Sequence, residues 1–279
     1  LSAIMKQQTT DRAREVLNDA MDIHGGSAIC LGENNFLEKF YRSAPIGITV
    51  EGSNVLTRNL IIFGQGLNKS HPHIFPILET ILDDNYNAFQ SQFQNILKHS
   101  VTLYFQALTT SFSKTTLENQ TIVFANMANF IALEGGKLKS HQMLSSTMAD
   151  ILSNLYLAHS INNFQEEYEV SSKLTNYCIQ EILYKNQHLI NSVIENIPHL
   201  KFIIGFSMKT AKAPTYKMKQ EIIKEVKENE KILAVLKEDI QIRNSPLEKL
   251  LKLDNYTKYS PDYKKLYDEV IQVGEYNNV

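Results

Sequence analysis

Hydrophobic residues recur every three or four positions along most of the chain, and this spacing places them on one face of an α-helix. The pattern predicts helices over residues 1–23, 86–112, 119–134, 140 onward and 170–196. Gly135-Gly136 ends the third of these, and Pro198 limits the last. The last four helices are joined by short turns and favour an up-and-down bundle, so we expect an all-α fold.

The segments on either side of this bundle have other patterns. Residues 66–76 predict a loop, because they combine glycine, proline and polar turn residues. Residues 217–242 alternate lysine with glutamate around a thin apolar stripe, which predicts one solvated helix docked on the bundle. Residues 245–270 predict two further short helices, and we expect the chain to fray beyond Gly274.

Charge and cysteine content narrow the classes of function. The 28 basic and 30 acidic residues give a formal net charge of −2, which argues against a nucleic-acid partner. Cys30 and Cys178 are too few and too far apart for a disulfide framework or a metal cluster, and this is typical of reduced thiols in the cytoplasm. The longest apolar clusters are far shorter than the roughly 20 residues of a membrane-spanning helix.

Candidate chemistry is concentrated in residues 22–65. A Gly25-Gly26 pair follows the first predicted helix, where it allows a sharp turn and leaves the backbone accessible to another molecule. Glu51 follows a mostly apolar run and is followed at once by Gly-Ser-Asn, a sequence that favours the start of a helix. Elsewhere the pattern indicates scaffold helices.

Two interpretations of Glu51 are open on spacing alone. A carboxylate at a helix start complements the helix dipole and stabilises it by a few tenths of a kcal/mol to about 1 kcal/mol. Alternatively, apolar neighbours make a carboxylate more basic, so that it can take a proton from a bound substrate. The first interpretation is the commoner one, and spacing does not choose between them.

Two other clusters have a structural explanation. The two histidines of His71-Pro72-His73 are potential metal ligands, but no third ligand follows at a recognisable spacing, so a turn is the better interpretation. Ser145-Ser146 with His141 and Asp150 contains the residue types of a hydrolase triad. Four such residues within one predicted helix are more typical of capping and of a solvated polar face.

The residues around Glu51 resemble a known family. Gly25-Gly26, then Arg42, then Glu51-Gly52-Ser53 nine residues later follow the pattern near the end of the C-terminal helical domain of acyl-CoA dehydrogenases. The longer stretches 18–26 and 56–58 are most similar to large bacterial enzymes of fatty-acid β-oxidation that carry an extra C-terminal region. The sequence is therefore identified as a C-terminal portion of such an enzyme.

The resemblance implies the chemistry of an FAD-dependent oxidoreductase that converts fatty acyl-CoA to trans-2-enoyl-CoA. In such an enzyme Glu51 takes the α-proton while the β-hydrogen leaves as hydride to the flavin. Gly52 leaves room for the thioester, and Ser53 contacts the flavin. Gly25 and Gly26 lie against the FAD of a partner subunit.

Some positions depart from the family pattern. Asp22 stands where many relatives have glutamine, and Ala28-Ile29 stand where they have glycine and an aromatic residue. Val55 stands where shorter relatives have glutamine. These differences weaken the assignment of individual flavin contacts, but they do not affect Glu51.

The resemblance also implies an organisation. Residues 1–70 correspond to the end of the dehydrogenase helical domain, 71–213 to an extra helical bundle and 214–279 to a charged helical tail. Because the chain begins with Leu inside a helical pattern, we expect a piece that depends on an upstream part of the enzyme. The expected partners are fatty acyl-CoA, an electron-transfer acceptor and further copies in a homo-oligomer, with no metal and no nucleic acid. The expected location is the cytoplasm, with peripheral contact at the inner membrane face left open.

Two alternatives remain open at this stage. The apolar and aromatic stripe over residues 86–112 is most simply a face packed in the bundle core, but it also suits an acyl-chain groove. The chain as a whole is either the catalytic portion described above or a non-catalytic helical assembly module, an inactive fragment that keeps the family's sequence without its flavin.

Overall fold

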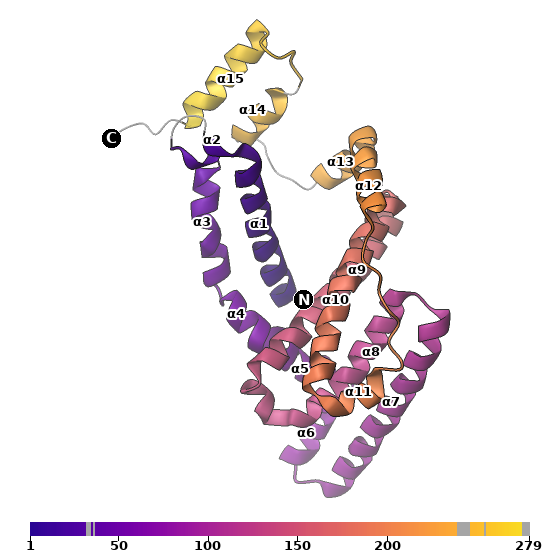
Figure 1. Ribbon diagram of the computed structural model, residues 1–279. Helices are drawn as coiled ribbons and strands as arrows, with labels where there is room; N and C mark the ends of the chain where they lie inside the picture. The colour runs from indigo at the N-terminus through magenta and orange to yellow at the C-terminus, as the bar shows by residue number, and fades with distance from the viewer. Residues whose placement is uncertain (32–34, 36, 239–245, 254, 275–279) are drawn as a thin grey trace. The chain divides into compact units, whose positions relative to one another are not determined.

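The computed structural model describes residues 1–31, 35, 37–238, 246–253 and 255–274. The regular structure of these residues is helical, and no strand occurs among them (Figure 1), which confirms the predicted all-α class. They divide into two compact units. Unit 1 comprises residues 1–4 and 54–235, and unit 2 comprises residues 5–53 and 236–279.

Unit 2 contains most of α1 and four further helices. The helices are α1 (Ser2–His24), α2 (Gly26–Ile29), α3 (Glu38–Thr49), α14 (Pro246–Leu253) and α15 (Pro261–Gly274). Gly25 ends α1 because its φ of 58° lies in the left-handed region that glycine adopts without strain. α1 and α3 lie side by side (Figure 1), and a Cβ added at Gly47 would stand only 3.3 Å from Cγ2 of Thr10. The glycine therefore allows this close approach.

Unit 1 contains the predicted bundle. Its helices are α4 (Asn54–Leu56), the π-helix η1 (Thr57–Gln65), α5 (Gly66–Ser70), α6 (Ile74–Leu82), α7 (Tyr86–Ser113), α8 (Thr116–Ile131), the 3-10 helix η2 (Ala132–Lys139), α9 (Gln142–Tyr168), α10 (Ser172–Asn196), α11 (Pro198–Ile204) and α12 (Tyr216–Glu228). α13 (Glu230–Lys237) runs across the division between the units. The helices predicted at 86–112, 140 onward and 170–196 are confirmed. The one predicted at 119–134 runs from Thr116 to Ile131. The prediction that Gly135-Gly136 ends it is wrong, because this pair lies within η2.

Local chemistry explains where the long helices begin and end. The Asn85 side chain accepts the N–H of Ala88 and caps α7. Thr115 and Glu118 form a reciprocal capping box, which is why α8 begins earlier than its apolar spacing indicates. Glu169, with φ of 50°, closes α9 in the left-handed conformation and allows the chain to return as α10.

The core of unit 1 lies between α7, α8, α9, α10 and η1. Its fully buried side chains include Met127, Met148, Ile151 and Ile190. Buried amides cross-link the same helices. Gln120 of α8 donates to Leu183 O on α10 over 3.1 Å, and Asn186 of α10 donates back to Gln120 Oε1 over 3.1 Å. These amides satisfy one another in an otherwise apolar interior, so they fix how α8 lies against α10.

Two predicted elements are wrong. Residues 66–76 are not a loop, because α5 continues from η1 to Ser70 and α6 begins at Ile74, which leaves only residues 71–73 outside a helix. The predicted helix over 217–242 is broken at Asn229, whose Oδ1 accepts the N–H of Lys231 at 3.2 Å. This local bond competes with the helical backbone bonds. Residues 239–242 of that prediction, and the expected fraying beyond residue 274, lie outside the described residues.

The charged helix α12 docks on α10 as expected. Lys173 Nζ of α10 lies 3.5 Å from Glu225 Oε2 of α12, and the Ser171 hydroxyl also donates to the Glu225 carboxylate.

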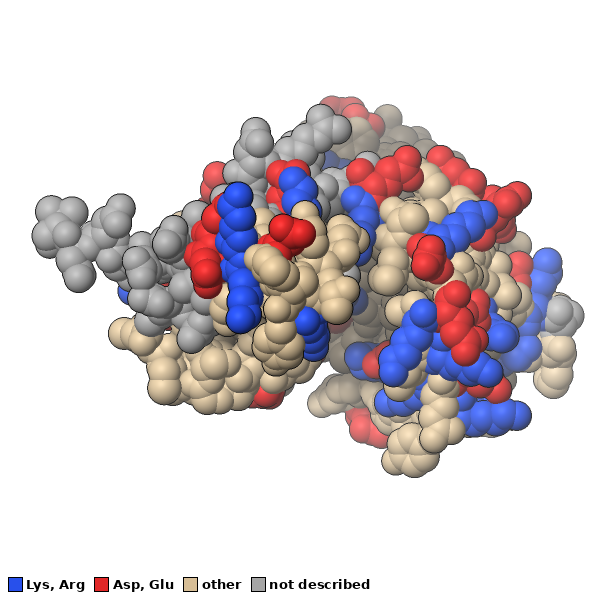
Figure 2. All heavy atoms as spheres, turned by 90° about the horizontal axis from the view of Figure 1, so that it is seen from above, with Lys and Arg blue, Asp and Glu red and all other residues tan. Residues whose placement is uncertain are grey.

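Basic and acidic side chains are interspersed on the face drawn in Figure 2. None of the helices in the described residues is both long and apolar enough to cross a membrane.

Candidate functional site

The turn that carries Glu51 has an unusual backbone. α3 ends at Thr49, and Glu51 and Gly52 then follow with φ of 55° and 83°, both in the left-handed region. Glycine adopts this region freely, but for a residue such as glutamate it costs roughly 1–2 kcal/mol. α4 begins at Asn54, so the prediction that a helix starts just after Glu51 is confirmed.

The carbonyl group of Gly52 is anchored to α1. Lys6 Nζ donates a hydrogen bond to Gly52 O over 2.8 Å, and both residues belong to unit 2. A hydrogen bond from a charged donor is stronger than one between neutral groups. This bond therefore helps to hold the turn with Glu51 in its left-handed backbone conformation.

The side chain of Glu51 is exposed to solvent. The apolar residues that precede it are exposed as well, with 48% of Val50 and 58% of Ile46 accessible. The expectation that Glu51 lies in apolar surroundings is therefore wrong for the described part of unit 2, because the apolar run ahead of it faces solvent instead of packing around the carboxylate.

Gly25 and Gly26 present open backbone. No atom lies within 4 Å of the position that a Cβ would take at either residue. The N–H of Gly25, however, is donated to Met21 O over 2.9 Å as the last bond of α1, so this donor is already used. The pair lies before α3 and Glu51 lies after it, and the twelve residues of α3 span about 18 Å. The structure therefore keeps the predicted site residues Gly25 and Gly26 apart from Glu51 and Gly52. Ser53, the next residue after Gly52, is half-buried.

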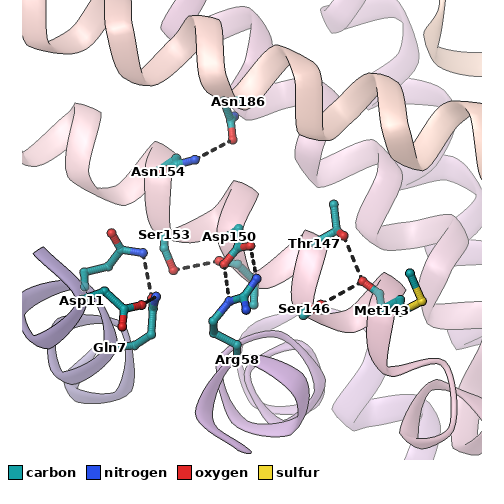
Figure 3. A network of polar contacts seen from close by, with 12 residues as sticks. Gln7, Asp11, Arg58, Met143, Ser146, Thr147, Asp150, Ser153, Asn154 and Asn186 are labelled. Atoms are coloured by element: carbon teal, nitrogen blue, oxygen red, sulfur yellow. Dashed lines mark hydrogen bonds and ion pairs between the residues drawn. The ribbon is translucent and has the colours of Figure 1, made fainter. Parts of the chain in front are cut away.

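Three of the four residues that suggested a hydrolase triad have other partners, and Figure 3 shows those of Asp150 and Ser146. Asp150 is paired with Arg58, and the Ser146 hydroxyl donates to Met143 O over 3.0 Å. His141 Nδ1 lies 3.1 Å from a carboxylate oxygen of Glu134. These contacts support the structural interpretation.

The Arg58–Asp150 pair joins η1 to α9 within unit 1. Arg58 Nε donates to Asp150 Oδ1 over 2.7 Å, and a second guanidinium nitrogen contacts Oδ2 (Figure 3). Both side chains are mostly buried, with accessibilities of 34% and 23%. A two-point contact between partly desolvated charges fixes orientation as well as proximity. Nothing in the sequence indicated this pair, because its members are 92 positions apart.

Three histidines form a cluster that the sequence did not reveal. His99 of α7 packs against His71 and His73, and the distances between ring centroids are 5.2–6.1 Å. His71 Nδ1 accepts the backbone N–H of His73 at 3.2 Å, so His71 Nε2 carries the proton and donates it to Asn129 Oδ1. Burial lowers the pKa of His71 and of His99 below the ordinary value, and the neighbouring histidines lower both further.

This cluster does not have the geometry of a metal site. Among the described residues, no group of three or more histidine, cysteine, aspartate or glutamate side chains could hold a metal ion. The ring of His71 is also committed at both of its nitrogens, as described above. The cluster is therefore a packed set of histidines.

Unit 1 also contains an apolar groove along α7, which we call the α7 groove. It consists of a cavity of about 760 Å³ and a second of about 510 Å³ that share the lining residues Phe93, Ile96 and Leu133. The interpretation of the α7 stripe as a face packed in the core is wrong for much of its length. Val101 and Phe105 are 56% and 61% exposed, so this part of the stripe is not packed in the core of unit 1.

Comparisons with known proteins agree with the resemblance read from the sequence. Residues 68–278 match the family described as acyl-CoA dehydrogenase, C-terminal, bacterial type. Residues 1–64 match the family described as acyl-CoA dehydrogenase, C-terminal domain. No solved structure matches the chain. The two matches cover nearly all of the sequence in consecutive order, and the chain therefore belongs to the acyl-CoA dehydrogenase family, as a C-terminal portion of the bacterial type.

Proposed function

We propose that this chain is the C-terminal part of an FAD-dependent dehydrogenase that oxidises fatty acyl-CoA to trans-2-enoyl-CoA in β-oxidation, with Glu51 as the base that removes the α-proton. The observation that carries the proposal is the left-handed backbone of Glu51. Strain of this kind occurs preferentially at functional sites, where it positions a side chain. Glycine would adopt this backbone conformation without strain, so the conformation alone does not explain why residue 51 is a glutamate. The carboxylate of the side chain explains it.

The turn provides three features that the reaction needs. The exposed carboxylate of Glu51 is accessible to a substrate. Gly52 has no side chain, so a thioester can approach the backbone there. The backbone N–H of Glu51 is assigned to the thioester oxygen, where negative charge develops as the α-proton leaves. Lys6 keeps this turn in place through Gly52 O.

The residues of this chain fit one part of an FAD site. Gly25 and Gly26 leave their backbone uncovered, so phosphate or ribose oxygens can approach it closely. Their distance from Glu51 along α3 supports their assignment to the FAD of a partner subunit, and Ser53 is assigned to the flavin next to Glu51. When bound, FAD supplies the acceptor for the β-hydride, and a separate electron-transfer acceptor reoxidises it.

Exposed apolar residues in unit 2 support an assembled enzyme. Val16 and Ile23 of α1 are 64% and 84% exposed, and Phe40 and Ile46 of α3 are more than half exposed. Apolar surface of this extent marks a protein contact. We assign residues 1–70 to the end of the dehydrogenase domain, which packs there against its upstream part and other copies, 71–213 to the extra bundle and 214–279 to the tail.

The test replaces Glu51 with Gln in the protein expressed from its complete gene. Turnover of palmitoyl-CoA with an artificial electron acceptor should fall by roughly 10²- to 10⁴-fold, since a general base contributes about that much. Bound flavin, read from its visible absorption, should stay unchanged. Glu15→Gln is the matched control, because Glu15 is an exposed glutamate of the same unit. Equal turnover in the Glu51 and Glu15 variants would refute the role of Glu51.

The second candidate is a helical assembly module without flavin. The exposed side chain of Glu51 and the exposed apolar faces of α1 and α3 favour it, because they are equally suited to binding another protein. In that case the complete protein would be stable and colourless, and palmitoyl-CoA would not be oxidised even by the unmodified enzyme.

A further inference from the structure

The connection between α5 and α6 is closed by the side chain of His71. Only residues 71–73 separate the two helices, and the Ile77 N–H is donated to His73 O over 3.2 Å where α6 begins. The ring of His71 accepts the backbone N–H of His73 at Nδ1 over 3.2 Å and donates from Nε2 to Asn129 Oδ1 on α8. One imidazole ring therefore holds the connection closed and fastens it to α8.

The bond at Nδ1 exists only while that nitrogen carries no proton. A neutral imidazole has one acceptor nitrogen, whereas both nitrogens of the charged form are donors. Protonation of His71 would set the new Nδ1–H against the His73 N–H, and two donors at a distance of 3.2 Å repel each other. Turning the ring away would break its bond to Asn129. The charged ring therefore fits only a connection that has opened.

Among the described residues, no carboxylate is bonded to the three histidine rings, so none offsets an added proton there. The ring centroids of His73 and His99 lie 6.1 and 6.0 Å from that of His71, and a charge on one ring disfavours a charge on another. Glu118 caps the far end of α8. The other charged residues of α5 to α8 and of the loop after α6 are exposed: Lys69, Glu79, Asp83, Asp84 and Lys98.

Burial and the neighbouring rings set the direction of the pH dependence. Burial lowers the pKa of both His71 and His99 below the ordinary value of 6.5, and the charge of neighbouring histidines lowers it further. The hydrogen bond to Asn129 raises the pKa of His71, but this effect is smaller than that of burial. A group whose pKa is lowered in the closed state stabilises that state above its ordinary pKa, and this stability is lost as the pH falls below it.

α6 is the element that can move when the connection opens. It packs on α5 and α7, but none of its residues is buried, and Ile81 and Leu82 are 56% and 84% exposed. A helix with few buried apolar contacts opens at a low cost in free energy. The fully buried side chains of unit 1 belong instead to other helices, as with Met127 of α8, Met148 of α9 and Ile190 of α10. α6 can therefore separate while this core stays folded.

We propose that His71 is a pH-sensitive switch for α6. While its Nδ1 is unprotonated, the connection between α5 and α6 stays closed and α6 stays packed on α7. Protonation of the ring breaks the bond to His73, opens the connection and releases α6 from the rest of unit 1. All residues of the switch belong to unit 1, and the proposal does not depend on the dehydrogenase function assigned to Glu51.

The test is hydrogen exchange of the 279-residue chain, followed by mass spectrometry and corrected for the intrinsic exchange rate at each pH. It is measured at about pH 7.5 and about pH 5.5, on either side of the ordinary histidine pKa. A ring that takes up a proton only in the open state increases the open population about tenfold for each pH unit below that value. Peptides that cover α6 should therefore lose about tenfold in protection at the lower pH, whereas peptides from α9 and α10 should stay protected.

Three variants assign the effect to His71. In His71→Asn the asparagine side chain accepts the N–H two residues ahead, as the imidazole does, but it does not titrate, so α6 should be equally protected at both pH values. His188→Asn is the matched control, because it removes an exposed histidine of α10, and it should behave like the unmodified chain. His99→Gln keeps His71 but removes one repelling ring, and it should show a smaller loss of protection.

Three outcomes would overturn the proposal. The first is equal protection of α6 at both pH values in the unmodified chain. The second is an undiminished loss of protection in His71→Asn or, should that variant not fold, in His99→Gln. The third is a loss in α9 and α10 that equals the loss in α6, which would show that unit 1 unfolds as a whole.

Discussion

Two buried asparagines of α8 provide a sharp test of how unit 1 is held together. Asn119 and Asn126 are both fully buried and lie two helical turns apart. Asn119 Nδ2 donates to Ser207 O over 2.9 Å and to Ala107 O over 3.1 Å, and its Oδ1 accepts the N–H of Lys209 over 2.7 Å. Neither side-chain polar atom of Asn126 has a partner within the described residues.

Replacing each asparagine with leucine should therefore change stability in opposite directions. Asn119→Leu removes at least three hydrogen bonds and leaves Ser207 O and Lys209 N–H without their partner. Two orphaned groups at about 1–3 kcal/mol each, less the roughly 1.5–3 kcal/mol gained from burying leucine, give an expected loss of about 2 kcal/mol. Asn126→Leu removes two unsatisfied atoms and should raise stability by about 1–2 kcal/mol.

The assay is urea unfolding of the 279-residue chain followed by circular dichroism. The midpoint of the unit 1 transition should fall for the Asn119 variant and should not fall for the Asn126 variant. A similar loss of stability in both variants would refute the reasoning, because it would show that burial and volume decide the effect and that the hydrogen bonds of Asn119 do not.

Three further predictions concern the turn, the histidines and the thiols. Glu51→Gly should stabilise unit 2 by roughly 1 kcal/mol in urea unfolding, because it relieves the left-handed strain, while it abolishes turnover in the complete enzyme. His71 and His99 have a lowered pKa in the folded chain, so as the pH falls below 6.5 the unfolded chain takes up protons first and stability decreases. His99→Gln should reduce this decrease in urea midpoints measured on both sides of pH 6.5, and an unchanged slope would contradict the assignment. Iodoacetamide should alkylate the exposed Cys30 well before the half-buried Cys178, whose pKa burial raises, as peptide mass spectrometry would show.

The helices were predictable because a period of three to four residues is a local property of the sequence. The periodicity located α7, α9 and α10 well. It failed at residues 66–76, where glycine and polar residues suggested a loop. There the helix continues as α5 because Leu67 packs against the core, and this tertiary contact outweighs the weak local preference.

The sequence pattern drew attention to the turn at Glu51, but the catalytic role of Glu51 was suggested by the resemblance and not by the pattern. Its position before a helix was predictable, but its left-handed backbone and the contact from Lys6 were not, since both depend on how α1 and α3 meet. The exposure of Glu51 also could not be read from the apolar run before it. A run of apolar residues indicates which side chains can be buried. It does not show whether another part of the protein covers them.

Long-range contacts were beyond sequence reasoning. His99 of α7 contacts His71 and His73, which lie between α5 and α6, and no spacing rule connects the three residues. The stripe on α7 was visible as periodicity, but whether it was covered depended on elements elsewhere in the chain. That the buried Ser145 hydroxyl and Asn129 Nδ2 lack hydrogen-bond partners within the described residues became apparent only once their neighbours were known.

The pairing of Arg58 with Asp150 has a consequence for how this protein can be divided. The first residue lies in the segment that matches one family description and the second in the segment that matches the other, yet both belong to unit 1. Ile62 and Phe63, just before the junction of the two segments, are buried in the same core as α9. Gene fusions or chimaeras that exchange the halves of related enzymes at this junction would therefore cut through one folding unit, whereas a crossover just before Asn54 would keep residues 54–235 of that unit together.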